Sequence, residues 1–241
     1  MNYKILLINL NYARGLNGTV ADSIRRFYRY LYTSKAIQQN ILSGLKGLIT
    51  REQPDLCCLI EIEPRHWQVL ADSTYPHGDV CVKYGPQSVV RHFPFHRTRC
   101  NGFLAKQPLA FKRHFLRHGT KKLVYEITLS NGATVFMGHF SLIASTRQKQ
   151  FAELKNLITS RSNIIVCGDF NIFREIQELA PLLQDTHLQL LNRPTDKTFP
   201  AYRPRYSLDL FLASDTIQVK TLQVIDQKFS DHLPLILELS I

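Results

Sequence analysis

The stretch NIIVCGDFNIF, residues 163–173, changes character halfway along. Its first half contains a continuous apolar run, residues 164–167, which is the pattern of a β-strand buried on both faces. The run then continues into Gly168, Asp169 and Asn171. Burying a carboxylate and a carboxamide is costly unless the groups are paired or functional. The stretch therefore predicts a core strand whose carboxyl end delivers Asp169 and Asn171 to a site.

Polar side chains stand at the ends of other predicted strands too. Taken singly, each has an ordinary structural explanation: Asn9 could cap a turn, His139 could be a satisfied core histidine, and Asp231 could begin a turn. Their common position at strand ends predicts one shared site instead. The residues and their apolar runs are Asn9 after KILLI (4–8), Glu61 after DLCCLI (55–60), His139 after TVFMG (134–138), Asp209 in YSLDLFL (206–212), and Asp231 and His232 in FSDHLPL (229–235).

The rest of the chain alternates between the hydrophobic periods of strands and helices. Asn131-Gly132 between two strand patterns predicts a hairpin. Residues 45–61 and 154–170 resemble each other, since each contains a helix end, a turn and a buried strand that delivers an acid. This repetition predicts two similar layers of sheet and helix, an α/β fold with mixed sheets. Strands are predicted at 4–10, 55–62, 122–129, 134–142, 163–169, 207–214 and 233–240, and helices at 20–50, 146–160 and 174–184.

Length and composition limit the class of protein. The 241 residues, 44% of them hydrophobic, contain no linker, so we expect a single domain over 1–241. No run approaches the roughly 18 apolar residues of a membrane span. We also expect no signal peptide, because Asn9 and Asn11 interrupt the first apolar run and no small-residue cleavage site follows it. These features predict a cytoplasmic monomer without a protein partner, although export without a signal stays open.

Cysteine and charge add two expectations. The five cysteines show no CxxC spacing, which predicts reduced, mostly buried thiols rather than disulfides or a zinc site. The net charge of +11 favours anionic partners, namely nucleic acid, phospholipid headgroups or phosphorylated small molecules. Between Asp79 and Glu126 there is no acidic residue, while lysine, arginine and histidine are frequent. This segment is either a solvated basic surface or the wall of an anion-binding site.

These motifs resemble the endonuclease/exonuclease/phosphatase superfamily of metal-dependent phosphoesterases. The matching pieces follow the order of that family along nearly the whole chain, and GDFN with a later SDHLP is the most specific of them. The family has Gln where this chain has Ile60, and often Thr where it has Gly138. The resemblance implies a four-layer α/β sandwich, two mixed sheets face to face with helices outside, and a helical insertion at 19–40. The matching pieces are LLINLNYARG, DLCCLIEIE, NGFLAKQPL, GHFSL with RQKQFAEL, VCGDFN, TFPAYRPRYSLDLFLAS and SDHLPL.

The resemblance also implies a role for each residue. Hydrolysis of a phosphoester needs an activated water, stabilisation of charge on the phosphoryl oxygens, and help for the leaving group. Mg²⁺ or Mn²⁺ is the implied cofactor, because both prefer oxygen ligands. The implied metal ligands are Glu61, Asn9 and Asp231. The implied catalytic residues are Asp169 to orient or deprotonate the water, Asn171 to hold the water or a phosphate oxygen, His232 to contact the scissile phosphate with Asp209 paired to it, and His139 to stabilise the transition state or assist the leaving group.

The substrate stays open among three classes. A nuclease would use the basic segment and its interleaved aromatics to bind DNA or RNA, and the expected substrate contacts are Arg97, Arg99, Asn101, Arg203 and Arg205. A phospholipid or phosphoinositide hydrolase would use residues 23–35, SIRRFYRYLYTSK, as a basic amphipathic helix on an anionic membrane. The ordinary alternative for that helix is that its apolar stripe packs on the core. The third class is a non-enzymatic binding protein or an enzyme that hydrolyses another small phosphoester.

Overall fold

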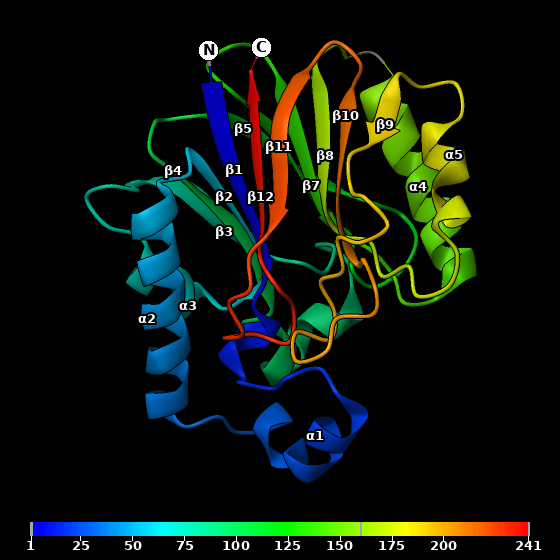
Figure 1. Ribbon diagram of the computed structural model, residues 1–241. Helices are drawn as coiled ribbons and strands as arrows, with labels where there is room; N and C mark the ends of the chain where they lie inside the picture. The colour runs from blue at the N-terminus through cyan, green and yellow to red at the C-terminus, as the bar shows by residue number, and fades with distance from the viewer. Residues whose placement is uncertain (1, 160, 241) are drawn as a thin grey trace.

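The computed structural model describes residues 2–159 and 161–240. Two six-stranded sheets lie face to face, with α2 and α3 beside one sheet and α4 and α5 beside the other (Figure 1). The predicted four-layer sandwich is therefore confirmed. The helices are α1 (Val20–Arg25), α2 (Lys35–Glu52), α3 (Pro64–Leu70), α4 (Ala144–Ile158) and α5 (Ala180–Leu183), and the 3₁₀ turns are η1 (Asn11–Ala13), η2 (Phe27–Tyr30), η3 (Val89–His92), η4 (Pro94–His96) and η5 (Ile176–Leu179).

The first sheet contains both ends of the described chain. Its strand order is β11-β12-β1-β2-β4-β3. The central pair, β1 and β2, is parallel, and the other neighbours are antiparallel. Two carboxyl ends therefore meet at one edge of this sheet. The strands are β1 (Asn2–Asn9), β2 (Leu56–Ile62), β3 (His77–Val82), β4 (Cys100–Ala105), β11 (Gln218–Val224) and β12 (Leu235–Ser240).

The second sheet repeats this plan. Its strand order is β5-β6-β7-β8-β10-β9, and its parallel pair is β7 with β8. The predicted hairpin at residues 131–132 joins β6 to β7, which pair antiparallel. The strands are β5 (Ala110–Phe115), β6 (Leu123–Thr128), β7 (Thr134–His139), β8 (Ile164–Asp169), β9 (Leu188–Leu190) and β10 (Asp209–Ser214).

The apolar core lies in three layers. One cluster fills the space between the sheets, and the other two lie between each sheet and its helices. β8 shows this division, because Ile165 and Cys167 face the other sheet while Ile164 and Val166 face α4. The five cysteines are free thiols, as predicted, and Cys81 alone among them is partly exposed. No helix in residues 2–159 and 161–240 is long and apolar enough to cross a membrane.

Two helix predictions were wrong in detail. The helix predicted over 20–50 is divided into α1, η2 and α2, since Thr19 and Ser34 each accept a backbone N–H as helix caps. The helix predicted over 174–184 begins only at Ile176 and starts as a 3₁₀ turn. Residues 23–35 do not pack their apolar stripe on the core, because Phe27 is 64% and Leu31 70% exposed. α1 and η2 instead lie beyond the lower end of the sheets (Figure 1).

Candidate active site

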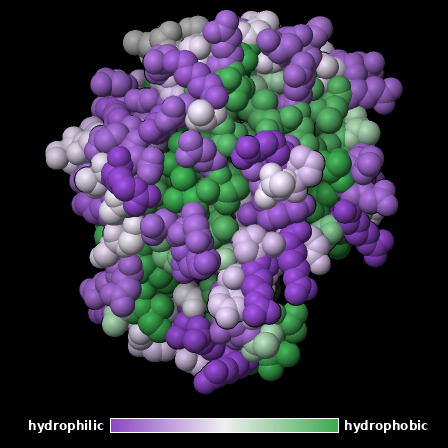
Figure 2. Space-filling model, viewed as in Figure 1, coloured by the Kyte–Doolittle hydropathy of each residue, from purple (hydrophilic) through white to green (hydrophobic). Residues whose placement is uncertain are grey.

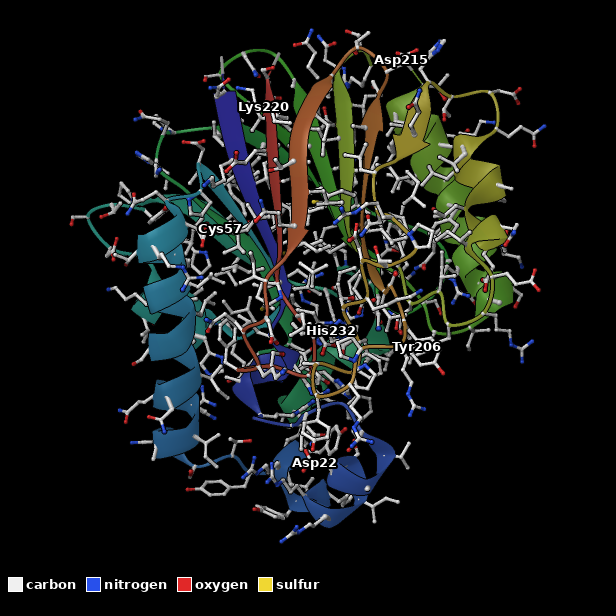
Figure 3. The ribbon with its side chains drawn as sticks, in the orientation of Figure 1. Asp22, Cys57, Tyr206, Asp215, Lys220 and His232 are labelled. Atoms are coloured by element: carbon white, nitrogen blue, oxygen red, sulfur yellow. The ribbon has the colours of Figure 1, made fainter. Side chains whose placement is uncertain are left out.

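The polar strand ends of both sheets meet at this lower end, where His232 lies (Figure 3). β1 and β2 deliver Asn9 and Glu61 from one sheet, and β7 and β8 deliver His139 and Asp169 from the other. Because the parallel pair of each sheet ends on this side, residues far apart in the sequence become neighbours. Asn9 Nδ2 donates to Asp169 Oδ2 over 2.9 Å across the two sheets.

The GDF segment, where β8 ends and the chain turns, has at Gly168 a backbone that only glycine can provide. Gly168 has a φ of +146°, and a Cβ there would lie 1.8 Å from the carbonyl oxygen of Gly138. Gly138 also leaves room for a ring, since a Cβ on it would lie 2.7 Å from Phe140. This packing accounts for Gly138 where the family often has Thr. Beyond Gly168 the turn is closed by Asn171, whose backbone N–H donates to Asp169 Oδ1 over 3.0 Å.

Asp169 lies at the centre of the site. His139 Nε2 is 3.3 Å from Asp169 Oδ2, the oxygen that also accepts from Asn9. Burial raises the pKa of Asp169 to about 6, with the nearby His232 opposing the shift and Asp209 adding to it. A carboxylate that titrates near neutral pH can accept a proton from water and release it again. This position therefore suits a general base.

His232 and Asp209 form a buried pair. His232 Nδ1 and Asp209 Oδ2 are 2.7 Å apart, and the ring of Phe199 packs 4.9 Å from the imidazole centroid. Burial alone would lower the pKa of His232, but Asp209, with Asp231 and Asp169, raises it to about 10. The imidazole is therefore charged at neutral pH. A fixed cation with a free Nε2 can bind a phosphoryl oxygen.

Glu61 is held in a strained backbone conformation, with a φ of +54°. Its backbone N–H donates to Asn101 Oδ1 over 3.1 Å, and its Oε1 accepts from Lys83 over 2.7 Å and from Tyr12 over 3.2 Å. Burial alone would raise the pKa of Glu61, but Lys83, His139 and Lys121 together lower it well below its usual value. Glu61 is therefore ionised. Asn101, an expected substrate contact, is buried and orients the Glu61 backbone.

Each of the three expected metal ligands, Asn9, Glu61 and Asp231, contacts another side chain of the protein. Among the described residues, no group of three or more His, Cys, Asp or Glu could hold a metal ion. Asp231 accepts from Asn11 over 2.7 Å and from Ser230 over 3.2 Å. The donor set still fits Mg²⁺, since that ion is often bound through one or two carboxylates and several waters. Glu61, with the Asn9 amide oxygen beside it, would hold the ion.

Two lysines in the site were missed by the sequence reading. Lys83 pairs with Glu61, and the ammonium of Lys121 contacts His139 Nε2. Burial lowers the pKa of Lys121 to about 8, and burial together with Lys121 and Lys83 holds the pKa of His139 well below its usual value. His139 is therefore a neutral imidazole beside a cation. Both lysines come from the acid-free segment between Asp79 and Glu126. The basic composition of that segment indicated an anion-binding wall, but nothing in the local sequence distinguishes these two lysines from their basic neighbours.

The predicted arginine contacts lie around the rim. Arg97 is exposed and donates to the carbonyl of His92 over 3.2 Å, and the guanidinium of Arg99 lies 5.2 Å from the Tyr12 ring centroid. Arg203 is exposed over Tyr202, and Arg205 lines a cavity of about 460 Å³ beside β10. A second cavity, of about 580 Å³, lies beside Tyr12 and Arg99. The first cavity adjoins Asn171 through Ile172, and the second adjoins Glu61 through Tyr12.

Solved structures share this fold at low sequence identity. The human Nocturnin catalytic domain with bound sulfate is 17% identical, covers 99% of this chain and 93% of its own, and has a TM-score of 0.70. ANGEL2, a 2′,3′-cyclic phosphatase, is 13% identical over 99% and 95% of the two chains with a TM-score of 0.72. A conserved protein of unknown function from Enterococcus faecalis is 16% identical over 98% and 99%, with a TM-score of 0.69.

Sequence comparison identifies the family. No curated protein sequence matches the chain. The model of the Endonuclease/Exonuclease/phosphatase family matches residues 37–232, which is most of the chain. The matched range contains Glu61, His139, Asp169, Asp209 and His232, the residues that converge in the structure. The chain belongs to the endonuclease/exonuclease/phosphatase family, whose members are hydrolytic phosphoesterases.

Proposed function

We propose that the protein is a Mg²⁺-dependent phosphodiesterase that cleaves nucleic acid. One observation carries this proposal: a basic cavity with aromatic walls adjoins the catalytic cluster beside each sheet. A nucleic-acid strand that lies in both cavities would place its phosphodiester backbone over Asp169 and His232. Grooves that combine cationic side chains with rings are typical of proteins that bind single-stranded nucleic acid.

The residues divide the work of hydrolysis. Asp169 orients the attacking water and takes its proton. His232, charged because of Asp209, binds a phosphoryl oxygen, and Asn171 holds a second one. His139 contacts Asp169 and Lys121, and this pair stabilises the charge that develops on the leaving oxygen. When bound by Glu61 and Asn9, the metal ion would neutralise charge on the phosphate.

The walls of the cavity beside β10 suit a base and its phosphate. Phe173 and Tyr206 lie with their ring centroids 5.2 Å apart, and both line the cavity with Lys197 and Arg205. Neither of these two cations forms an ion pair within the described part of the chain. Rings stack on any base, and unpaired cations neutralise the backbone.

The test uses purified protein with supercoiled plasmid, single-stranded DNA and RNA, each in Mg²⁺, Mn²⁺ or EDTA. We expect cleavage that needs the metal and falls by about a hundredfold or more in Asp169→Asn, because the general base is lost. Asp215→Asn is the matched control, since this exposed carboxylate lies at the opposite end of the sheets (Figure 3). Undiminished cleavage by Asp169→Asn, or no cleavage of any polymer by wild-type protein, would disprove the proposal.

A second candidate, a phospholipid phosphodiesterase, is favoured by one observation. Exposed aliphatic side chains accompany the aromatics at the active-site end, among them Ile24 at 73% and Leu31 at 70% exposure. Figure 2 shows a small green area among hydrophilic residues at the lower end of the surface, where Figure 1 places α1. Aliphatic chains cannot stack on bases, but they gain from burial in hydrocarbon, and the nearby exposed Arg25 suits an anionic membrane.

Sedimentation with anionic vesicles separates this candidate from the first. For a lipid enzyme, we expect wild-type protein to sediment with phosphatidylglycerol vesicles and to hydrolyse their lipid, and the double change Phe27→Gln and Leu31→Gln to abolish both. Val219→Gln, an exposed apolar residue of β11, is the control. Wild-type protein that stays in the supernatant would exclude the membrane candidate.

A further inference from the structure

Three arginines converge on the cavity beside Tyr12, and we name this cavity the arginine pocket. Arg14, Arg29 and Arg99 line it together with Tyr12 and Tyr30, and its volume is about 580 Å³. The Arg14 guanidinium lies between two rings, 4.9 Å from the Tyr12 centroid and 4.8 Å from that of Tyr30. A cavity of this volume is large enough for a nucleotide.

The three guanidinium groups have no carboxylate partner within residues 2–159 and 161–240. Neutral oxygens orient them instead: Arg14 Nη1 donates to Asn11 Oδ1 over 3.0 Å, Arg29 Nη1 to the Gly15 carbonyl over 2.7 Å, and Arg99 Nε to the Phe95 carbonyl over 3.0 Å.

Two features of the arginine pocket call for an anion. Arg14 is only 8% exposed, and Arg29 Nε is buried without a hydrogen-bond partner. Burial and the repulsion from Arg99 lower the pKa of Arg14, although the nearby Glu61 opposes this shift. The carboxylate that lines the pocket, Glu63, is engaged by Arg65 over 2.7 Å. Buried charges without partners are costly, and they persist where a ligand supplies the opposite charge.

The arginine pocket is coupled to the catalytic centre by two side chains. The hydroxyl of Tyr12 donates to Glu61 Oε1, while the guanidinium groups of Arg14 and Arg99 make cation–π contacts with its ring. Asn11 donates to Asp231 Oδ2 and accepts from Arg14. One tyrosine ring therefore separates Glu61 from the cationic wall. A molecule whose phosphodiester lies at the catalytic centre would place its next anionic group in the pocket.

We propose that the arginine pocket binds a second phosphate group of the substrate, so that the enzyme selects nucleic-acid strands that carry a phosphate next to the scissile phosphodiester. This inference rests on the proposed function. Planar guanidinium groups bind phosphate through pairs of parallel hydrogen bonds, and three such groups match its oxygens. Tyr30 offers a ring to the adjoining base.

The experiment measures binding without catalysis. Dithymidylate with a 5′-phosphate and the same dinucleotide without it are titrated calorimetrically into the full-length protein in EDTA. We expect wild-type protein to bind the phosphorylated form about tenfold more tightly or better, as expected for charge-assisted hydrogen bonds to phosphate. Since no cleavage is needed, an inactive protein can still support the inference, whereas failure to bind either dinucleotide would count against the proposed function as well.

Variants assign the effect to the arginine pocket. The double change Arg29→Gln and Arg99→Gln avoids the most buried arginine, and we expect it to reduce the preference below about threefold while binding of the unphosphorylated dinucleotide stays within about twofold. Arg51→Gln, on an exposed part of α2, keeps the full preference. No preference in wild-type protein, or an equal loss of affinity for both dinucleotides in the double variant, would overturn the proposal.

A lipid headgroup also contains a phosphate group. A competition experiment therefore distinguishes a nucleotide phosphate from a lipid phosphate as the group that binds in the arginine pocket. Pyrophosphate is bound first, and either the 5′-phosphorylated dinucleotide or a water-soluble short-chain phosphatidic acid is added. We expect the dinucleotide to displace pyrophosphate at the lower concentration. Displacement by the phosphatidic acid alone would overturn the nucleotide assignment and place a lipid phosphate in the arginine pocket.

Discussion

At the scale of single residues, neighbouring charges give two buried groups different ionisation. Asp169 and His232 are both buried, yet the pKa of Asp169 rises only to about 6 while that of His232 rises to about 10. Burial disfavours charge on both, but Asp209 restores the charge of the imidazole. At neutral pH the site therefore contains a base that can accept a proton and a fixed cation that can hold phosphate.

The change Asp209→Asn tests this division. Because the pKa of His232 is raised from 6.5 to about 10, the pair stabilises the fold fully below about pH 6.5, and this stabilisation is lost as the pH rises through 10. In the variant, the pKa of His232 should be near or below 6.5. The loss in the free energy of unfolding should be largest below about pH 6.5. NMR titration of the imidazole and urea unfolding at several pH values measure both. An imidazole in the variant that still titrates near pH 10 would contradict the pairing.

At the scale of elements, the site depends on how β7 and β8 approach each other. Their register places Gly138 beside Gly168, so two glycines face each other one residue before His139 and Asp169. A Cβ on Gly168 would lie 1.8 Å from the Gly138 carbonyl oxygen and would push these ends apart. The close approach therefore holds His139 Nε2 within 3.3 Å of Asp169 Oδ2.

Gly168→Ala should break this arrangement. Its Cβ would lie 1.8 Å from a backbone oxygen at a φ of +146°, so we expect a loss of about 3 kcal/mol or more in the free energy of unfolding. Gly47→Ala is the control, because a Cβ there would meet nothing within 4 Å and alanine favours the α2 helix by about 1 kcal/mol. Urea denaturation measures both. A Gly168→Ala protein within about 1 kcal/mol of wild type would show that the two strands can separate without cost.

At the scale of the whole molecule, a strongly cationic protein places several of its acids together in one site. The net charge is +11, yet Asp169, Asp209 and Asp231 lie together at one end of the sheets. The surplus cations are therefore free to act on a polyanion from outside.

This distribution predicts a strong dependence of binding on salt. With about five phosphate contacts, the affinity for single-stranded DNA should fall about a hundredfold between 50 and 200 mM salt. Fluorescence anisotropy in EDTA, where no cleavage occurs, measures it. A change below about threefold would mean that phosphate neutralisation contributes little, and would favour the membrane candidate.

Local features of this protein follow from its sequence, whereas contacts between distant residues depend on the tertiary structure. The sequence by itself determined what lies within a few residues: the buried strand runs, the Asn131-Gly132 hairpin, and the acids, amides and histidines at strand ends. Such features follow from local hydrophobic periodicity and turn chemistry, which neighbouring residues decide. The family resemblance rested on the same local motifs.

The tertiary structure alone decided which side chains meet. Asn9 and Asp169 are 160 residues apart, and Lys83 reaches Glu61 from the residue that follows β3. Neither contact has a local signal, and the same holds for the exposure of the apolar residues around α1 and for the arginine pocket. Packing of the two sheets sets these distances and the burial that shifts each pKa, and packing depends on the whole chain at once.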